Sequence, residues 1–286
     1  MVNKRRNTAK DKGKAPATDV APPELPDDLP ENFPYQFTWE LSQMSKLVLL
    51  EVLDQGKMGY CWTIAYNRMI GAHLYIHDRT RLLLELSPKH LFAHIEEKFA
   101  NGNLKSYEGL KNFLKDDGLV REEDCKCIAG KNEQSSTDAC DKVKDKQVFK
   151  IRDLKVVEGK NVDEKEVIFL LKTIGPIAVE LEFTTAYIAD KTGNIYYGPP
   201  QHIKPFVLRK HIVLLTKYST DRNGISYFKF QNSYGRGWGD NGYGKFARKV
   251  SLPKGSQSLI KSYMYPELLD QNIEMYTNVE AHEAAE

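Results

Sequence analysis

One cysteine, Cys61, lies where a thiol gains nucleophilic character. Two glycines, Gly56 and Gly59, form a tight loop before it, and an apolar pattern with helical spacing begins at Trp62. The unpaired N–H groups and the positive dipole end of a helix N-terminus favour the thiolate, the form of cysteine that attacks a carbonyl carbon. The sequence therefore predicts a thiol nucleophile at the start of a helix.

A nucleophilic thiol needs a base, and one of the seven histidines has a suitable place. His211 opens the run His-Ile-Val-Leu-Leu-Thr, a pattern typical of a strand that is buried on both faces. A ring held there is positioned and is shielded from bulk water. We predict that His211 accepts the proton of Cys61.

Asn232 is the residue expected to orient the imidazole. The strand that His211 opens and the strand that ends at Asn232 are joined by a short polar loop. If Tyr218 pairs with Ile225, antiparallel pairing puts His211 opposite Asn232. A two-residue turn would instead place Asn232 opposite Leu215, about 14 Å from His211 at roughly 3.4 Å per residue. An amide oxygen that accepts the ring N–H would fix the tautomer and leave the other nitrogen facing the thiol.

Gln55 completes the set of candidates. It precedes Cys61 by six residues, so its side-chain amide would join the Cys61 N–H as a donor to a developing oxyanion. Taken singly, these residue types are more often structural: an inert buried thiol, a core histidine or a turn asparagine. Their combination in this order is what favours a catalytic site.

The chain around these residues changes from a helical to a strand-rich pattern. Residues 61–118 are predicted to be helical, with a second helix that begins at Pro88 and has Ser87 as its N-cap. After about residue 145, short β-branched and aromatic segments separated by turn residues predict strands. This order indicates two lobes with a cleft between them.

We therefore expect four segments. They are a disordered leader at 1–34, basic and then rich in proline and acids; a mainly helical lobe at 35–145 that carries Cys61; a strand-rich lobe at 146–261 that carries His211 and Asn232; and a loosely held acidic tail at 262–286.

Composition excludes several classes of protein. The 41 Lys and Arg against 39 Asp and Glu give a net charge of +2, which provides no general attraction to nucleic acid. The longest apolar stretches are too short to span a bilayer, so we expect a soluble protein with no membrane partner. The first 30 residues lack an apolar core of the kind found in signal peptides, which predicts a cytoplasmic or nuclear rather than a secreted protein.

The segments around the candidate residues resemble those of the papain-like cysteine peptidases. The similar segments are Asp54-Gln55-Gly56 with Gly59-Tyr60-Cys61-Trp62, Leu86-Ser87-Pro88, Lys210-His211, and Gln231-Asn232-Ser233-Tyr234-Gly235 with Trp238-Gly239. Weaker similarity fills the gaps from about Asn32 to Arg248.

The resemblance implies an α+β, papain-like two-lobe fold, with a helical left lobe, an antiparallel β-barrel-like right lobe and the active-site cleft between them. It also implies a thiolate–imidazolium pair of Cys61 and His211, with Asn232 orienting the ring and Gln55 in the oxyanion hole. The expected reaction is hydrolysis of a peptide bond through an acyl-enzyme intermediate. It needs no cofactor, its substrate is a peptide or protein, a proteinaceous inhibitor is a further candidate partner, and the chain is expected to be a monomer.

The substrate-binding candidates also rest on the resemblance. They are Gly102, Asn103, Glu180, Ile212 and Trp238. Asn103 stands where a glycine of the family pairs with substrate, and Ile212 stands where a small residue is common. Glu180 falls near the pocket for the side chain before the scissile residue, where it would favour a basic residue.

Other departures concern cysteines and the cover of the histidine. Met58, His94 and Pro200 stand where the family has disulfide cysteines, so those bridges cannot form. Tyr234 replaces the tryptophan that covers the Asn–His bond. Such changes leave open a second interpretation, a weak or inactive papain-like protein that acts as a binding or decoy module with its cleft narrowed by Tyr60, Asn103 and Ile212. A third interpretation is a nucleic-acid-associated factor that acts through the basic leader.

Metal binding is not expected. Cys125, Cys127 and Cys140 match no zinc-ligand spacing and are interpreted as part of a reduced surface loop. The pairs His73/His77 and His90/His94 lack the His-Glu-x-x-His order and are interpreted as lying on solvated helix faces.

Overall fold

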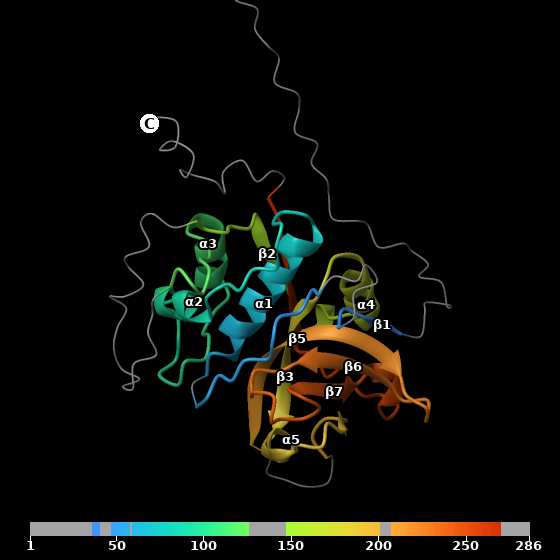
Figure 1. Cartoon of the computed structure of the whole chain (residues 1–286). Coiled ribbons are helices and arrows are strands. Elements are labelled where there is room, and N and C mark those ends of the chain that lie inside the picture. The colour runs from blue at the N-terminus through green and yellow to red at the C-terminus, as the bar shows by residue number, and fades with distance from the viewer. Residues whose placement is uncertain (1–35, 41–46, 58, 126–146, 201–206, 270–286) are drawn as a thin grey trace, which may run out of the picture.

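A helical lobe lies beside a large β-sheet in the computed structural model, which describes residues 36–40, 47–57, 59–125, 147–200 and 207–269 (Figure 1). The helical lobe is built from α1 (Cys61–Ile76), α2 (Pro88–His94) and α3 (Glu108–Asp116). Two further helices, α4 (Glu164–Thr173) and α5 (Thr185–Ala189), accompany the sheet. The expected combination of helices with a β-sheet, an α+β fold, is confirmed.

Local signals decide where the helices begin. The Ser87 hydroxyl accepts a hydrogen bond from the His90 N–H at 3.3 Å, and Pro88 occupies the first turn of α2, as predicted. The central helix α1 begins at Cys61 and is buried on nearly all sides. Because neighbouring elements surround it, α1 is the helix on which the lobe is assembled.

Within the described residues the sheet has eight strands, in the order β2-β8-β3-β5-β6-β7-β4 with β1 paired to β5. Their bounds are β1 (Phe37–Thr38), β2 (Asp153–Glu158), β3 (Ile177–Thr184), β4 (Ile195–Tyr196), β5 (Leu208–Thr220), β6 (Ser226–Gln231), β7 (Tyr243–Ala247) and β8 (Ser262–Glu267). All pairs are antiparallel except β4–β7. Within the described ranges the end strands β2 and β4 do not pair with each other, so the barrel-like closure that we expected is wrong. A two-residue β4 offers too little edge for closure.

The last strand corrects the expected boundary of the acidic tail. We expected a loosely held segment from residue 262, but Ser262–Glu267 form β8, which pairs with both β2 and β3. Tyr263 and Met264 are fully buried. Burial of these side chains outweighs the scarcity of basic residues that suggested a tail. The leader and residues 270–286 lie outside the described residues.

Strand β5 joins the two hydrophobic cores. Ile212 and Leu214 pack into the cluster around α1, whereas Val213 and Leu215 pack into the cluster between the sheet and α4. This alternation follows from the two-residue period of a strand. By the same alternation His211, at the beginning of the buried part of β5, shares the face of Val213, and its ring lies against Phe183 and Tyr234. In the part of the chain that the structure describes, no helix is long and apolar enough to cross a bilayer.

In each of the two histidine pairs expected on solvated helix faces, one ring is buried. His73 and His90 are buried, and the His73 Nε2 lies 2.8 Å from the Pro176 carbonyl oxygen. The prediction is wrong for these two rings because their helices pack on more than one side. Among the described residues, no group of three or more potential metal-ligating side chains is present.

Burial of these rings predicts acid-sensitive folding. Desolvation lowers the pKa of His73 to about 3, below the usual value of 6.5. The unfolded chain therefore binds the proton more tightly, and stability that is present above pH 6.5 is lost as the pH falls below it. We expect His73 alone to remove about 2 kcal/mol from the free energy of unfolding between pH 7 and pH 5.

Denaturant unfolding at both pH values measures this loss. His73→Gln is expected to have a smaller pH dependence than the parent chain, because its amide donates to the same carbonyl without titrating. His77→Gln, at an exposed position one turn further along, is the matched control. An unchanged pH dependence in His73→Gln would contradict the prediction.

Candidate active site

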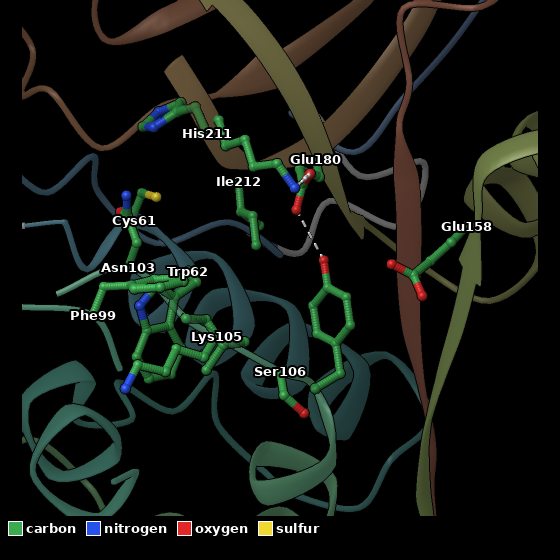
Figure 2. A pocket seen from close by; sticks show the side chains of 13 residues that line it. Cys61, Trp62, Phe99, Asn103, Lys105, Ser106, Glu158, Glu180, His211 and Ile212 are labelled. Atoms are coloured by element: carbon green, nitrogen blue, oxygen red, sulfur yellow. Dashed lines mark hydrogen bonds and ion pairs between the residues drawn. The ribbon is translucent and has the colours of Figure 1, made fainter. Parts of the chain in front are cut away.

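The four residues predicted to do chemistry meet beside two adjoining cavities. One cavity, of about 560 Å³, and another, of about 820 Å³, are both lined by Cys61, Asn103, Lys210 and His211. Figure 2 shows Cys61 and His211 at one end of the smaller cavity, with Glu180 further along it. The thiol and the imidazole thus lie where the cavities meet, so an extended ligand would pass from one cavity to the other across them.

Cys61 is the first residue of α1, and its side chain is buried. Burial raises the pKa of the thiol to about 11, backbone hydrogen bonds from Ile212 and Trp62 act to lower it, and the charge of Glu180 raises it further. The helix start therefore acts in the predicted direction. Desolvation nevertheless outweighs it, so the protonated thiol is the resting form.

His211 is held by Asn232. Its Nε2 lies 2.7 Å from the Asn232 Oδ1, which also accepts the Ser233 N–H at 2.8 Å. Because this amide oxygen is an acceptor, the Nε2 carries the ring hydrogen and the Nδ1 presents a lone pair. Burial lowers the pKa of His211 to about 4 although the bond to Asn232 raises it, so the resting ring is neutral.

The contact between His211 and Asn232 arises by a different register from the one predicted. Tyr218 pairs with Phe228 instead of Ile225, and the register shifts between Leu215 and Lys217. Strand β6 ends at Gln231, opposite Leu214. The next residue leaves the β5–β6 ladder: the Asn232 N–H donates to the Gly242 carbonyl at 2.9 Å, and its side chain reaches His211.

Gln55 is fixed by the residue that follows Asn232. The Gln55 N–H donates to the Ser233 carbonyl at 2.8 Å, and the Ser233 hydroxyl donates to the Gln55 Oε1 at 2.5 Å. Since the oxygen of the amide is the acceptor, its nitrogen is the donor end. Gln55 lines the larger cavity together with Cys61.

These contacts can be compared with known proteins. Residues 33–266 match the model of the papain family of cysteine proteases. The chain belongs to this family.

The chain spans about half the length of the curated relatives that it matches. A cathepsin L-like peptidase of Aedes aegypti is 26% identical over 201 residues, which cover 69% of this chain and 55% of that protein. Mouse cathepsin K is 25% identical over 197 residues, which cover 69% of this chain and 56% of that protein.

Solved structures support the papain-like fold. The proform of the ragweed pollen cysteine protease Amb a 11 aligns with a TM-score of 0.65 and 22% identity, covering 82% of this chain and 66% of that one. Bromelain of Ananas comosus, solved with the E64 inhibitor, aligns with a TM-score of 0.62 and 21% identity, covering 83% of this chain and 100% of that one.

Tyr234 stands where the tryptophan of the papain family was expected, and it does cover the histidine. Its ring stacks on His211 with centroids 4.7 Å apart and an angle of 28° between planes. Its hydroxyl lies 3.3 Å from the His211 Nδ1. Trp238 packs edge-on behind it, at 5.7 Å between centroids.

Two of the five substrate-binding candidates line neither cavity. Trp238 is buried, and its Nε1 donates to the Ile188 carbonyl at 2.8 Å. The Gly102 carbonyl accepts a hydrogen bond from the Trp62 Nε1 at 3.0 Å. Both residues therefore support the walls of the site from behind.

The other three candidates do line the smaller cavity: Asn103, Glu180 and Ile212. Both backbone groups of Asn103 are hydrogen-bonded within the chain, its N–H to the Asn101 Oδ1 at 3.1 Å and its carbonyl to the Phe99 N–H at 2.9 Å. A substrate backbone that pairs here must displace one of these bonds. Gly59 is required opposite this wall, because a Cβ there would overlap the Asn103 amide.

Glu180 carries a charge network that sequence reasoning did not find. Its carboxylate accepts the Tyr107 hydroxyl at 3.0 Å and lies 3.2 Å from the Lys210 Nζ (Figure 2). Tyr107 is 73 residues away in the chain, and no local pattern signals the pairing. Of the remaining cysteines, Cys125 is buried, which corrects its assignment to a surface loop, and Cys127 and Cys140 lie outside the described residues.

Proposed function

We propose that the chain hydrolyses peptide bonds as a cysteine-type peptidase, with Cys61 as nucleophile, His211 as base and Asn232 as the residue that orients the ring. The observation that carries the proposal is the bond of 2.7 Å from His211 to Asn232 beside a thiol at a helix start, on the boundary of two cavities. Membership of the papain family supports it.

The donor assignments define the proton path. The Cys61 proton moves to the His211 Nδ1 as the sulfur attacks the carbonyl carbon of the peptide. The Cys61 N–H and the Gln55 amide donate to the oxyanion that forms. The imidazolium then gives its proton to the leaving amine, which produces a thioester. Water, deprotonated by the same nitrogen, attacks the thioester and releases the acid and the thiol.

Burial determines when the ion pair forms. Desolvation raises the thiol pKa and lowers the imidazole pKa, so separate charges on these groups are unfavourable. Adjacent opposite charges offset part of that cost. We infer that proton transfer and attack on the substrate are coupled, instead of starting from a stable ion pair.

Active-site labelling tests the proposal. The reduced protein is treated with a peptidyl epoxide, the modified cysteine is identified by mass spectrometry, and hydrolysis of a fluorogenic peptide is followed in parallel. Labelling of Cys61 with one equivalent, together with turnover, is the expected result. Cys125 serves as an internal control, because it is also buried but lines neither cavity. Equal labelling of the cysteines would refute the proposal, and selective labelling without turnover would indicate a binding module.

Glu180 is proposed to select a basic substrate residue. Its side chain is 14% exposed and lines the smaller cavity. There the ammonium group of Lys210, whose side chain is 71% exposed, pairs with the Glu180 carboxylate. A basic substrate group would replace the Lys210 ammonium. We expect Glu180→Gln to reduce the preference for a basic over a neutral residue about twofold to fivefold, the size of one partly exposed ion pair.

The ratio of kcat/KM for two peptides that differ only in the residue before the scissile one measures this preference. Glu158→Gln is the matched control, because Glu158 lines the same cavity but is exposed. A ratio that stays the same in Glu180→Gln would exclude the assignment.

A further inference from the structure

The nitrogen of His211 that the proposed function needs is already engaged. Asn232 occupies the Nε2, so the Nδ1 is the only ring atom with a lone pair. The Tyr234 hydroxyl lies 3.3 Å from this Nδ1, and as an O–H facing a lone pair it is the donor. Among the hydrogen bonds of the described residues, none joins the Cys61 thiol to His211.

We propose that the Tyr234 hydroxyl competes with the Cys61 thiol for the His211 Nδ1 and thereby lowers the reactivity of the thiol. The inference rests on the proposed function, because it assigns the Nδ1 as the base for Cys61. Tyr234 acts through His211 and is therefore a positioning residue. To transfer its proton to the Nδ1, the thiol must first displace the hydroxyl.

The surroundings of Tyr234 keep its hydroxyl in place as a neutral donor. Burial raises the pKa of Tyr234 far above its usual value, and the charge of Cys61 raises it further although Arg209 lowers it. Both Tyr234 and His211 line the larger cavity beside Cys61. The ring is held by stacking on His211 and by the edge of Trp238. Tyr234 therefore covers the His211 ring, as the expected tryptophan would, and also places a hydroxyl beside the Nδ1.

Charged side chains of β3 and β5 act on Cys61 and Tyr234. From β3, Glu180 acts on Cys61 and raises its pKa, and Lys210 of β5 pairs with Glu180. From the same strand, Arg209 acts on Tyr234. Phe183, also on β3, carries no charge, and its ring centroid lies 5.6 Å from that of His211. The pH dependence of the thiol is thus set by Cys61 and His211 beside the charge of Glu180, since burial keeps Tyr234 protonated.

Tyr234→Phe removes the hydroxyl and keeps the stacked ring. In this variant the Nδ1 is open to the thiol proton, so alkylation of Cys61 by iodoacetamide is expected to be about fivefold faster at pH 6 to 7, the effect of one neutral hydrogen bond. Because the hydroxyl stabilises the neutral ring, its loss raises the pKa of His211, and the acid limb of the pH–rate profile is expected to move about 0.7 pH unit higher. The sulfur bonds to the methylene carbon, iodide leaves, and the proton held on His211 passes to water.

Tyr187→Phe is the matched control. Tyr187 also packs edge-on against Trp238, at 5.8 Å, but its hydroxyl donates to the Lys245 carbonyl at 2.9 Å. Tyr234→Trp, a second variant without the hydroxyl, is expected to react faster than the parent as well. Rates are read on the Cys61 peptide by mass spectrometry, and thermal unfolding verifies that each variant is folded.

The outcomes separate this inference from the proposed function. Faster alkylation and an acid limb at higher pH in both Tyr234 variants, with Tyr187→Phe unchanged, would support the inference even if neither the parent chain nor any variant hydrolysed a peptide. Peptide hydrolysis with alkylation that is unchanged or slower in the folded Tyr234 variants would overturn the inference and leave the function in place. An equal acceleration in Tyr187→Phe would also overturn it.

Discussion

Cys61→Ser is expected to lower kcat/KM for peptide hydrolysis about a thousandfold or more. A serine hydroxyl gives up its proton far less readily than a thiol, and the base beside it is a buried imidazole whose pKa is lowered to about 4. Serine is slightly smaller than cysteine, so the start of α1 and the surrounding packing are retained. The loss therefore reports chemistry, and thermal unfolding within a few degrees of the parent verifies this.

Cys125→Ser is the control for this prediction. Cys125 is a buried cysteine like Cys61, but it packs in a small separate cluster with Val120. We expect Cys125→Ser to keep the full activity of the parent. If Cys61→Ser retained more than a tenth of the parental activity, Cys61 would not be the nucleophile.

Features set by neighbouring residues were predicted correctly. The start of α2 depends on Ser87 and Pro88, and the start of α1 on the glycine-containing loop before Cys61. These signals act within one helical turn, so the sequence displays them directly.

The register of β5 and β6 could not be predicted in the same way. The shift lies at Thr216, whose carbonyl accepts the Trp39 N–H of the segment after β1 at 2.9 Å and whose hydroxyl lies 3.4 Å from the Lys229 carbonyl. Trp39 is far from Thr216 in sequence, and the alternation of side chains along β5 is compatible with either register. Tertiary pairing therefore decides where Asn232 lies.

Long-range packing also explains the other errors. His73 is buried because α1 packs against the segment before β3, where Pro176 provides the partner for the ring. Tyr107 and Glu180 come together from different lobes. The hydroxyl of Tyr234 meets His211 only because stacking fixes the ring. Sequence spacing identifies which residues are candidates, whereas such contacts determine their protonation and charge.

Gly242→Ala is expected to lower the free energy of unfolding by about 2 to 4 kcal/mol, from about 1 kcal/mol of backbone strain and about 1 to 3 kcal/mol of overpacking. Gly242 has φ of +89°, and a Cβ there would lie 2.5 Å from the Val52 Cγ1. Its carbonyl accepts the Asn232 N–H. Displacement of this backbone would move Asn232 relative to His211, so activity is expected to fall as well as stability.

Gly224→Ala isolates the contribution of that contact. Gly224 has φ of +80°, nearly the same backbone conformation, but nothing lies within 4 Å of a Cβ placed on it. In Gly224→Ala only backbone strain, about 1 kcal/mol, lowers the free energy of unfolding. Gly224 lies in the β5–β6 loop, away from Asn232. Denaturant unfolding and kcat/KM are compared for both variants. Equal losses of stability would show that the contact with Val52 contributes nothing, whereas a loss of kcat/KM confined to Gly242→Ala would show that the backbone at Gly242 positions the residue that orients His211.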